Sequence, residues 1–261
     1  MKKIAVLIAL AAMLASACAH AQEPPLKMGP PLKMGVEGAY PPFNFVDAAG
    51  KVEGFDVDIG EALCARLARK CEWIVVPWDG LIPALQAGKF DVLMSSMTIT
   101  AERRKQVLFT KPYYFSYGMM IAARGSGLAF SAAGLKGRSI GVQAATTHEA
   151  WLRDKFGAAI ELHAYPSSDD MFLDFQNGRL DAVFAEAPAM VPWMEKNGGT
   201  QAYEQIGPNI TDPALGTEIG IAVRKDDNAM AARLDAAMDG IVADRTFAAI
   251  AKKYFSFDLR P

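Results

Sequence analysis

The sequence predicts an α/β protein with two similar lobes, and two internal similarities support this prediction. Residues 85–96 (LQAGKFDVLMSS) and 175–186 (FQNGRLDAVFAE) each indicate a helix that ends at a glycine and is followed by a buried strand with a polar end. Residues 32–37 (LKMGVE) and 138–143 (RSIGVQ) form a second matching pair. Because α/β sheets bind ligands beyond the carboxyl ends of their strands, two such lobes predict a ligand cleft between them.

Residues 1–21 have the features of a secretory signal peptide. Two lysines precede the apolar run 4–14, and Ala19–Ala21 (AHA) matches the A-x-A cleavage pattern. We therefore expect cleavage near Ala21, a mature chain that begins near Gln22, and a periplasmic location. Lipid anchoring at Cys18 is the second alternative.

The charge of the exported chain argues against a nucleic acid or an anionic membrane as partner. The sequence has 27 basic and 29 acidic residues, and residues 1–21 hold two lysines and no acid, so 25 basic and 29 acidic residues remain, a net charge of −4. The length allows two lobes with a sizeable core. No later segment is long and apolar enough to cross a membrane, and we expect a soluble monomer.

The cysteines and histidines indicate a disulfide and no metal site. Cys64 and Cys71 are an even, closely spaced pair in an exported chain, which predicts that they are bonded. The histidines, His20, His148 and His163, show no metal-ligand spacing. No Ser-His-Asp or Cys-His signature is present, so we predict no catalytic residue, no metal and no cofactor.

Residues 88–104 (GKFDVLMSSMTITAERR) are the stretch around which a binding site is predicted. Residues 91–94 indicate a buried strand, and Thr100 is a candidate N-cap that places Arg103 in the first turn of a helix. Hydroxyl groups, free backbone N–H groups and a guanidinium at one strand end suit a carboxylate. The alternative is a capped turn with a solvated arginine. The hydroxyl side chains are those of Ser95, Ser96, Thr98 and Thr100.

The elements before this stretch also place polar or aromatic groups at strand ends. Glu37 ends the first strand and is followed by a loop rich in glycine and proline, which contains Tyr40. A helix is predicted from Gly54 to Lys70, with acids near its N-terminus. A strand at 73–76 follows, and then a helix that begins near Trp78.

Four motifs in the chain, in their order along the sequence, resemble those of polar amino-acid-binding proteins of ABC importers. They are residues 54–59 (GFDVDI), 78–85 (WDGLIPAL), 94–100 (MSSMTIT) with Arg103, and 251–255 (AKKYF). The resemblance extends from about residue 33 to residue 257 and includes the cysteine pair. It is strongest to the lysine/arginine/ornithine and histidine receptors, and their opine-binding relatives are also similar.

The resemblance implies a type II periplasmic-binding-protein fold, with two Rossmann-like lobes joined by two hinge strands. Lobe 1 would comprise residues 22–116 and 218–261, and lobe 2 residues 117–217. The hinge strands would lie near residues 117–120 and 219–222. A ligand that bridges the lobes would stabilise the closed form, which the membrane permease of the importer would recognise.

The resemblance also implies a role for each site residue. Arg103, Thr98 and Thr147 would hold the α-carboxylate of the ligand. Glu186 and Ser96 would hold its α-ammonium group. Tyr40 and Trp78 would sandwich the side chain, with Glu37 and Ser95 near its far end. The full ligand-binding set is Glu37, Tyr40, Trp78, Ser95, Ser96, Thr98, Arg103, Gln143, Thr146, Thr147 and Glu186.

This chain departs from the basic amino-acid receptors at several of these positions. Glu186 and Glu37 stand where those receptors carry Asp, and Gln143 replaces an apolar residue. Ala185 and His148 stand where they carry Gln, and we expect His148 to be a surface residue at a helix start. These changes leave the headgroup chemistry intact and leave the ligand side chain open.

Other aromatic and methionine residues in the second half of the chain are expected to be structural. We expect residues 113–115 and the methionines at 119–120 in the hinge and core, and Trp151 and Trp193 in the core.

The predicted function is import of a cationic or polar L-amino acid of the arginine, lysine, ornithine or histidine type. Glu37 has no intramolecular cation in view, so the ligand is expected to supply a positive charge. Three alternatives remain: an opine receptor of the same class, an enzyme resembling periplasmic cyclohexadienyl dehydratases, and a free binding protein that docks on a sensor.

Overall fold

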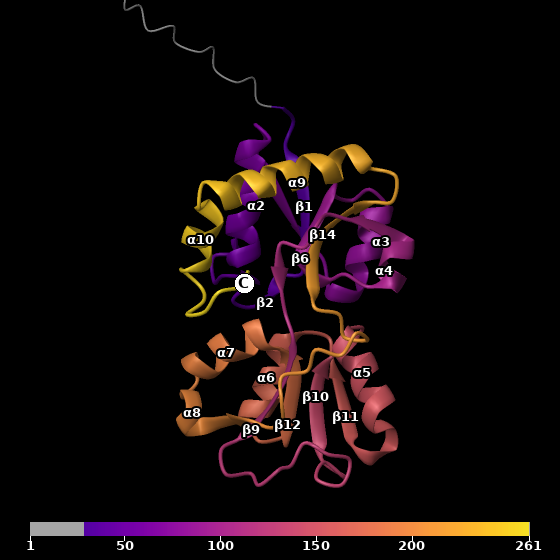
Figure 1. Ribbon diagram of the computed structural model, residues 1–261, viewed down its shortest axis with the longest axis vertical. Helices are drawn as coiled ribbons and strands as arrows, with labels where there is room; N and C mark the ends of the chain where they lie inside the picture. Colours follow the sequence, from indigo (N-terminus) through magenta and orange to yellow (C-terminus); the bar gives the residue numbers. More distant parts are fainter. Residues whose placement is uncertain (1–28, 261) are drawn as a thin grey trace, which may run out of the picture.

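The computed structural model describes residues 29–260, and two lobes follow one another along its long axis (Figure 1). The predicted signal peptide and Cys18 lie outside the described residues. Each lobe has its own β-sheet with helices packed beside it, which confirms the predicted two-lobe α/β architecture.

Lobe 1 is built on a six-stranded mixed sheet in the order β5-β1-β6-β14-β7, in which β8 also pairs with β14. Its strands are β1 (Leu32–Val36), β5 (Cys71–Val75), β6 (Val92–Thr98), β7 (Val107–Phe109), β8 (Tyr114–Phe115) and β14 (Glu218–Arg224). Its helices are α2 (Phe55–Arg66), η1 (Trp78–Gly80), α3 (Leu81–Gln86), α4 (Ala101–Gln106), α9 (Asn228–Ala243) and α10 (Thr246–Ala251). A small sheet contains β2 (Ala39–Tyr40), β3 (Asn44–Val46) and β4 (Val52–Glu53).

Lobe 2 is built on a five-stranded sheet in the order β11-β10-β12-β9-β13. Its strands are β9 (Gly118–Ala123), β10 (Ser139–Gln143), β11 (Glu161–Tyr165), β12 (Ala182–Glu186) and β13 (Tyr203–Gln205). Its helices are α5 (Thr147–Phe156), η2 (Gly157–Ala159), α6 (Ser168–Gln176), α7 (Ala187–Lys196) and α8 (Gly199–Ala202). In each lobe one strand runs parallel to both of its neighbours: β1 lies between β5 and β6, and β10 lies between β11 and β12. The carboxyl ends of these strands therefore lie at one edge of each sheet.

The internal similarity in the sequence has a packing cause. In lobe 1 a Cβ atom added to Gly35 would lie 2.3 Å from the ring of Phe90, the residue that precedes β6 by two positions. In lobe 2 a Cβ atom added to Gly141 would lie 2.5 Å from the side chain of Leu180, at the equivalent place before β12. A glycine in β1 of lobe 1 and a glycine in β10 of lobe 2 therefore make room for the apolar residue of the repeated motif.

The aspartate of the repeated motif forms the same two hydrogen bonds with the neighbouring strand in both lobes. The Asp91 side chain accepts a hydrogen bond from the backbone N–H of Lys33 at 3.3 Å, and the Asp91 N–H donates to the Lys33 carbonyl at 2.9 Å. Asp181 makes the same two bonds with Ser139, each of 2.8 Å. The motif therefore fixes where β6 starts beside β1 in lobe 1 and where β12 starts beside β10 in lobe 2.

The chain crosses between the two sheets in two adjacent segments. It leaves lobe 1 at residues 116–117 and returns through residues 211–217, and the Ser116 N–H donates to the Thr217 carbonyl at 2.8 Å. Gly118 and Ile210 form a β-bridge directly beyond them. The ranges predicted as hinge strands fall instead mostly inside β9 and β14, because the strands of the two sheets begin right after each crossing.

Several predicted boundaries shift in the structure. The helix that begins after Gly54 ends at Arg66 and not at Lys70, and β5 begins at Cys71. Cys64 in the last turn of α2 is bonded to Cys71, with 5.8 Å between their Cα atoms. The strand predicted at 91–94 continues to Thr98, because β14 pairs with its second half.

Most of the expected structural aromatic residues pack in the core, but Phe115 on β8 is 41% exposed because β8 lies at the edge of the lobe 1 sheet. Tyr113 and Tyr114 are fully buried, with their rings 4.9 Å apart. Trp151 is buried against Phe184, and Trp193 stacks on a phenylalanine of α6. Within residues 29–260 no helix combines the length and apolar character needed to cross a membrane.

The Cys64–Cys71 bond gives the first prediction. Mass spectrometry of the exported protein without reduction should detect no free thiol at either position. A Cys64→Ala, Cys71→Ala double variant should unfold with a free energy lower by about 2 kcal/mol, the amount expected for a short closed loop. Two alkylatable cysteines in unreduced periplasmic material would contradict the prediction.

Candidate functional site

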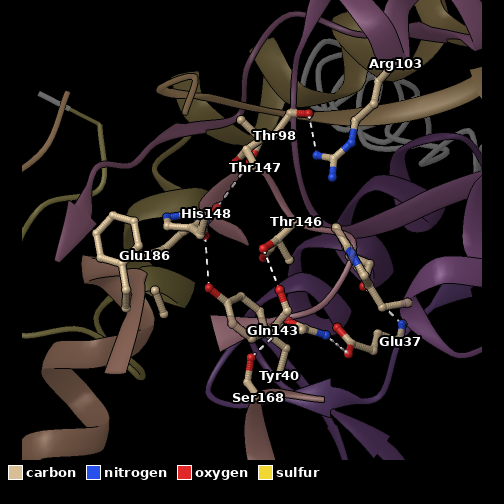
Figure 2. A pocket seen from close by; sticks show the side chains of 15 residues that line it. Glu37, Tyr40, Thr98, Arg103, Gln143, Thr146, Thr147, His148, Ser168 and Glu186 are labelled. Atoms are coloured by element: carbon tan, nitrogen blue, oxygen red, sulfur yellow. Dashed lines mark hydrogen bonds between the residues drawn. The ribbon is translucent and has the colours of Figure 1, made fainter. Parts of the chain in front are cut away.

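One pocket lies between the lobes and contains all of the predicted ligand-binding residues (Figure 2). It encloses about 430 Å³ of space free of protein atoms, which includes its opening to solvent. Strand ends and helix starts from both lobes surround it, as the parallel strands of the two sheets require. The 15 lining residues are Glu37, Tyr40, Trp78, Ser95, Ser96, Thr98, Arg103, Gln143, Thr146, Thr147, His148, Ser168, Phe184, Ala185 and Glu186.

Three hydroxyl residues of lobe 1 line the pocket, and all three lie within β6. Ser95, Ser96 and Thr98 are all buried, and the Ser95 hydroxyl accepts a hydrogen bond from the Glu37 backbone N–H at 3.0 Å. Ser96 has a positive φ of 48°, in the left-handed region that residues other than glycine rarely adopt. Its hydroxyl donates to Asp56 at 2.9 Å.

Arg103 is positioned by the start of α4. Its backbone N–H donates to the Thr100 hydroxyl at 3.1 Å, so the predicted N-cap is confirmed. Its Nη1 donates to the Thr98 carbonyl at 2.9 Å, and its Cζ lies 5.2 Å from the centre of the Trp78 ring. Burial lowers the pKa of Arg103 to about 10, which leaves the guanidinium charged at neutral pH. Among the described residues it has no carboxylate within ion-pair distance, so donors remain for a ligand.

The first turn of α5 faces the pocket from lobe 2. Thr146 is its N-cap: the hydroxyl accepts from the Glu149 N–H at 3.2 Å and donates to the Gln143 carbonyl at 2.7 Å. Thr147 is the first residue of the helix and also lines the pocket. The N-terminus of this ten-residue helix therefore points its positive end at the cleft.

The expectation that His148 is a surface residue is wrong. It is only 8% exposed, lines the pocket and packs edge-on against Phe184 at 5.1 Å between ring centres. Burial, with the charge of Arg103, lowers the pKa of His148 to about 3, so its ring is neutral at neutral pH. Its Nε2 is buried without a hydrogen-bond partner among the described residues. The position next to Thr147 was the signal available in the sequence.

Glu186 ends β12 and is held by lobe 1. Its carboxylate accepts from the Tyr40 hydroxyl at 3.1 Å and from the Thr98 hydroxyl at 3.3 Å. Burial raises the pKa of Glu186 to about 7, although both hydrogen bonds and the charge of Arg103 oppose the rise. The side chain is 7% exposed and forms no ion pair within the part of the chain that the structure describes.

Glu37 directly follows β1 in lobe 1, and its side chain is held by lobe 2. Gln143 Nε2 donates to its carboxylate at 2.5 Å, and the Ser168 hydroxyl donates to the other end of the Gln143 amide at 3.0 Å. Burial raises the pKa of Glu37 to about 7, and the Asp169 charge adds to the rise. Within residues 29–260 no cation lies within ion-pair distance of Glu37, in agreement with the expectation from the sequence.

The two aromatic residues predicted to contact the ligand, Trp78 and Tyr40, belong to lobe 1. Trp78 Nε1 donates to the carbonyl of Ala145 in lobe 2 at 3.2 Å. Tyr40 stacks on Phe43 with 5.4 Å between ring centres, while its hydroxyl reaches Glu186. The sandwich of a ligand side chain between Tyr40 and Trp78 stays a prediction.

The predicted ligand-binding set lacks four of the lining residues, which are His148, Ala185, Phe184 and Ser168. Phe184 lies two positions before Glu186 on β12, so strand alternation places both on one face and could have identified it. Ser168 begins α6 beside β10, and a single serine at a helix start carries no specific signal.

The charges of the pocket suit a ligand with more positive than negative charge. Of the lining residues only Arg103, Glu37 and Glu186 are charged above neutral pH, one cation against two carboxylates whose pKa values lie at about 7. Arg103 and the α5 N-terminus are suited to a carboxylate, and Glu186 is suited to an ammonium group. Glu37 then remains for a second cation.

Comparison with known proteins identifies the family. The family model of bacterial extracellular solute-binding proteins, family 3, matches residues 32–257. The chain is 38% identical to the L-arginine-binding protein of Pseudomonas aeruginosa, over 99% of this chain and 98% of the relative. It is 34% identical to the histidine-binding periplasmic protein of Salmonella typhimurium, over 99% of each chain.

A solved structure agrees with these sequence relatives. The arginine-specific periplasmic binding protein of Salmonella typhimurium superposes with a TM-score of 0.80 and 34% identity, over 87% of this chain and 100% of that one. All three proteins are named as binding proteins. The match of the family model over nearly all described residues shows that the chain belongs to the bacterial extracellular solute-binding proteins, family 3.

Proposed function

We propose that this protein captures a cationic L-amino acid, of the arginine, lysine, ornithine or histidine type, and delivers it to the permease subunits of an ABC importer. The observation that carries the proposal is the presence of Arg103, Glu37 and Glu186 in one interlobe pocket. The names of the arginine- and histidine-binding relatives support the same ligand class and a binding role rather than an enzymatic one.

In the proposed complex each charge of the ligand has one partner. Arg103, Thr98 and Thr147 hold the α-carboxylate, and Glu186 with Ser96 holds the α-ammonium. The side chain extends past Tyr40 and Trp78 to Glu37 and Ser95, with Gln143 and Thr146 beside it. Because a buried charge without a partner costs several kcal/mol, this pairing favours a cationic amino acid over a neutral one.

Lobe closure provides the signal to the importer. The hydrogen bonds from Tyr40 and Thr98 to Glu186, and from Gln143 to Glu37, all join one lobe to the other. A ligand that contacts the same groups ties the lobes together, and residues 116–117 and 211–217 serve as the hinge. We propose lobe 1 as residues 22–116 and 218–261, and lobe 2 as residues 117–217.

The proposed location is the periplasm, where the protein acts as a monomer after cleavage near Ala21. Its periplasmic relatives support this location. Lipid attachment at Cys18 is the less favoured form.

A thermal-shift screen of the purified mature protein tests the function. Arginine, lysine, ornithine and histidine should raise its melting temperature more than leucine or glutamate, because a ligand at a hundredfold excess over Kd stabilises by about 2.7 kcal/mol. Octopine and nopaline test the opine alternative in the same plates. Turnover of prephenate or arogenate by the pure protein would favour the enzyme alternative. A shift with neutral or acidic amino acids alone would overturn the proposal.

The role of Glu37 is tested with a variant in the same screen. Glu37→Gln should weaken binding of the preferred cationic amino acid by at least about 1 kcal/mol more than binding of glutamine, since only the cation loses a charged partner. Glu72→Gln, which alters an exposed carboxylate on β5, is the control and should leave both affinities unchanged. Equal losses for both ligands would make Glu37 a bystander.

The role of Arg103 is tested by calorimetry. Arg103→Ala should weaken ligand binding by about 2–5 kcal/mol, because the carboxylate would be buried without its partner. The melting temperature without ligand should change little, since the guanidinium makes one hydrogen bond within the described chain. Arg104→Ala, an exposed neighbour on α4, should bind as the wild type does. An Arg103→Ala affinity within a few-fold of wild type would reject the assignment.

Binding should strengthen as pH rises through neutrality. The pKa values of Glu37 and Glu186 are raised by burial from 4.5 to about 7, so below that pH a cationic ligand must displace protons. The folded protein binds more protons than the unfolded chain between these values, so without ligand its stability should fall as pH rises from about 4.5 to 7.

Calorimetry at pH 5.5 and pH 8 provides the measurement. Affinity should rise by about tenfold for each carboxylate that loses its proton, and Glu37→Gln should show a smaller rise. His148, with its pKa near 3, does not titrate in this window. An affinity that is flat between the two pH values would contradict the expectation.

A further inference from the structure

A buried carboxylate that does not line the pocket lies directly beneath it. Asp56, the second residue of α2, is 0% exposed. Its Oδ1 accepts from the Tyr113 hydroxyl at 2.6 Å, and its Oδ2 accepts from Asn44 Nδ2 and the Ser96 hydroxyl, each at 2.9 Å. No cation lies within ion-pair distance of Asp56 in residues 29–260.

The contact with Ser96 fixes a pocket residue in an uncommon conformation. Ser96 lines the pocket and has a positive φ of 48°, which a residue with a Cβ adopts only where its surroundings hold it. Asp56 accepts a hydrogen bond from the Ser96 hydroxyl at 2.9 Å, and both groups are buried. The acceptor that stabilises this backbone conformation is therefore Asp56.

The second contact reaches the loop that carries Glu37 and Tyr40. Asn44 donates to Asp56 through Nδ2, and its Oδ1 accepts from the Gly38 backbone N–H at 2.9 Å. Gly38 has a φ of 76° and lies between the two pocket residues. One amide side chain therefore links Asp56 to the turn that sets the direction of Glu37 and Tyr40.

The third contact reaches the first crossing between the lobes. Tyr113 is 1% exposed and lies just before β8, and residues 116–117 leave lobe 1 directly after that strand. The Tyr113 N–H donates to the Ile219 carbonyl at 2.9 Å. Ile219 is in β14, the strand that directly follows the returning segment 211–217. The same carboxylate therefore contacts the floor of the pocket, the Glu37–Tyr40 turn and the root of the hinge.

We propose that Asp56 is a positioning residue of the ligand site, which holds Ser96 and the Glu37–Tyr40 turn in their binding geometry and joins them to the hinge through Tyr113. This inference rests on the proposed function. A residue with a purely structural role would contribute to stability without changing the affinity of the folded protein. Asp56 in a positioning role contributes to affinity, because small displacements of ligand-holding groups weaken binding strongly.

Two adjacent tyrosines allow a matched test. Tyr113 and Tyr114 are both fully buried, but the Tyr113 hydroxyl bonds to Asp56 whereas the Tyr114 hydroxyl has no partner among the described residues. Tyr113→Phe should weaken L-arginine binding by about fivefold, the effect of one typical intramolecular hydrogen bond. Tyr114→Phe should bind within about twofold of wild type. Calorimetry well below the melting temperature of each variant provides the measurement.

The direct variant and a double variant complete the test. Asp56→Asn places an NH₂ group against at least one of the three donors and removes the negative charge, so it should weaken binding by at least about tenfold in any folded fraction. Asp58→Asn, on the same helix but bonded to Lys253 and Tyr254, is its control. If Asp56 acts through Ser96, the loss in a Tyr113→Phe, Ser96→Ala double variant should be smaller than the sum of the single losses.

The outcomes separate this inference from the proposed function. If the wild type does not bind L-arginine, the proposed function fails on its own, and the same variants are compared with whichever amino acid the wild type does bind. If Tyr113→Phe lowers the melting temperature yet binds as tightly as Tyr114→Phe, Asp56 is structural and the inference is wrong. Should Asp56→Asn fail to fold, the tyrosine pair still decides.

Discussion

Two carboxylates buried at an interlobe contact without a cation constrain this structure more than any other feature. Glu37 directly follows β1 in lobe 1, and Glu186 is the last residue of β12 in lobe 2. Within residues 29–260, each carboxylate accepts hydrogen bonds only from side chains of the other lobe. Burial raises both pKa values to about 7, so hydrogen bonds alone do not offset the desolvation of the charged forms. In the proposed complex, recognition of a positive ligand and contact between the lobes therefore depend on the same atoms.

The fold produces this arrangement by using one packing device twice. The register of both lobes is set by three residues: a glycine in β1 or β10, an apolar residue that packs on it, and an aspartate that hydrogen-bonds to the backbone of that strand. Once the register is set, Glu37 and Gln143 occupy equivalent strand ends, and β6 and β12 bring their polar ends to the same edge. The two crossings, bonded to each other at Ser116 and Thr217, then turn the two edges face to face.

Much of this could be predicted from the sequence because the relevant signals are local. The repeated motif indicated two lobes, and the hydroxyl-rich stretch with Arg103 indicated one side of the pocket. What could not be predicted depends on long-range contacts. β6 extends through Ser96 only because β14, more than a hundred residues later, pairs with it. His148 was misassigned because burial at a helix start depends on the neighbouring strand β12. The acids of α2 were interpreted through the helix dipole, whereas Asp56 is held by groups from three other segments.

The division of charges between the lobes gives closure a physical cause. Lobe 1 carries Arg103 and Glu37, which suit a carboxylate and a distal cation, whereas the only ionic group that lobe 2 contributes to the pocket is Glu186. In the proposed complex a cationic amino acid on lobe 1 alone would have an α-ammonium group without a carboxylate partner. Bringing Glu186 into contact completes the pairing, and the free energy of that last ion pair is available only in the closed form. A ligand that lacks an α-ammonium group gains nothing from that step, so selection for amino acids and selection for closure are the same event.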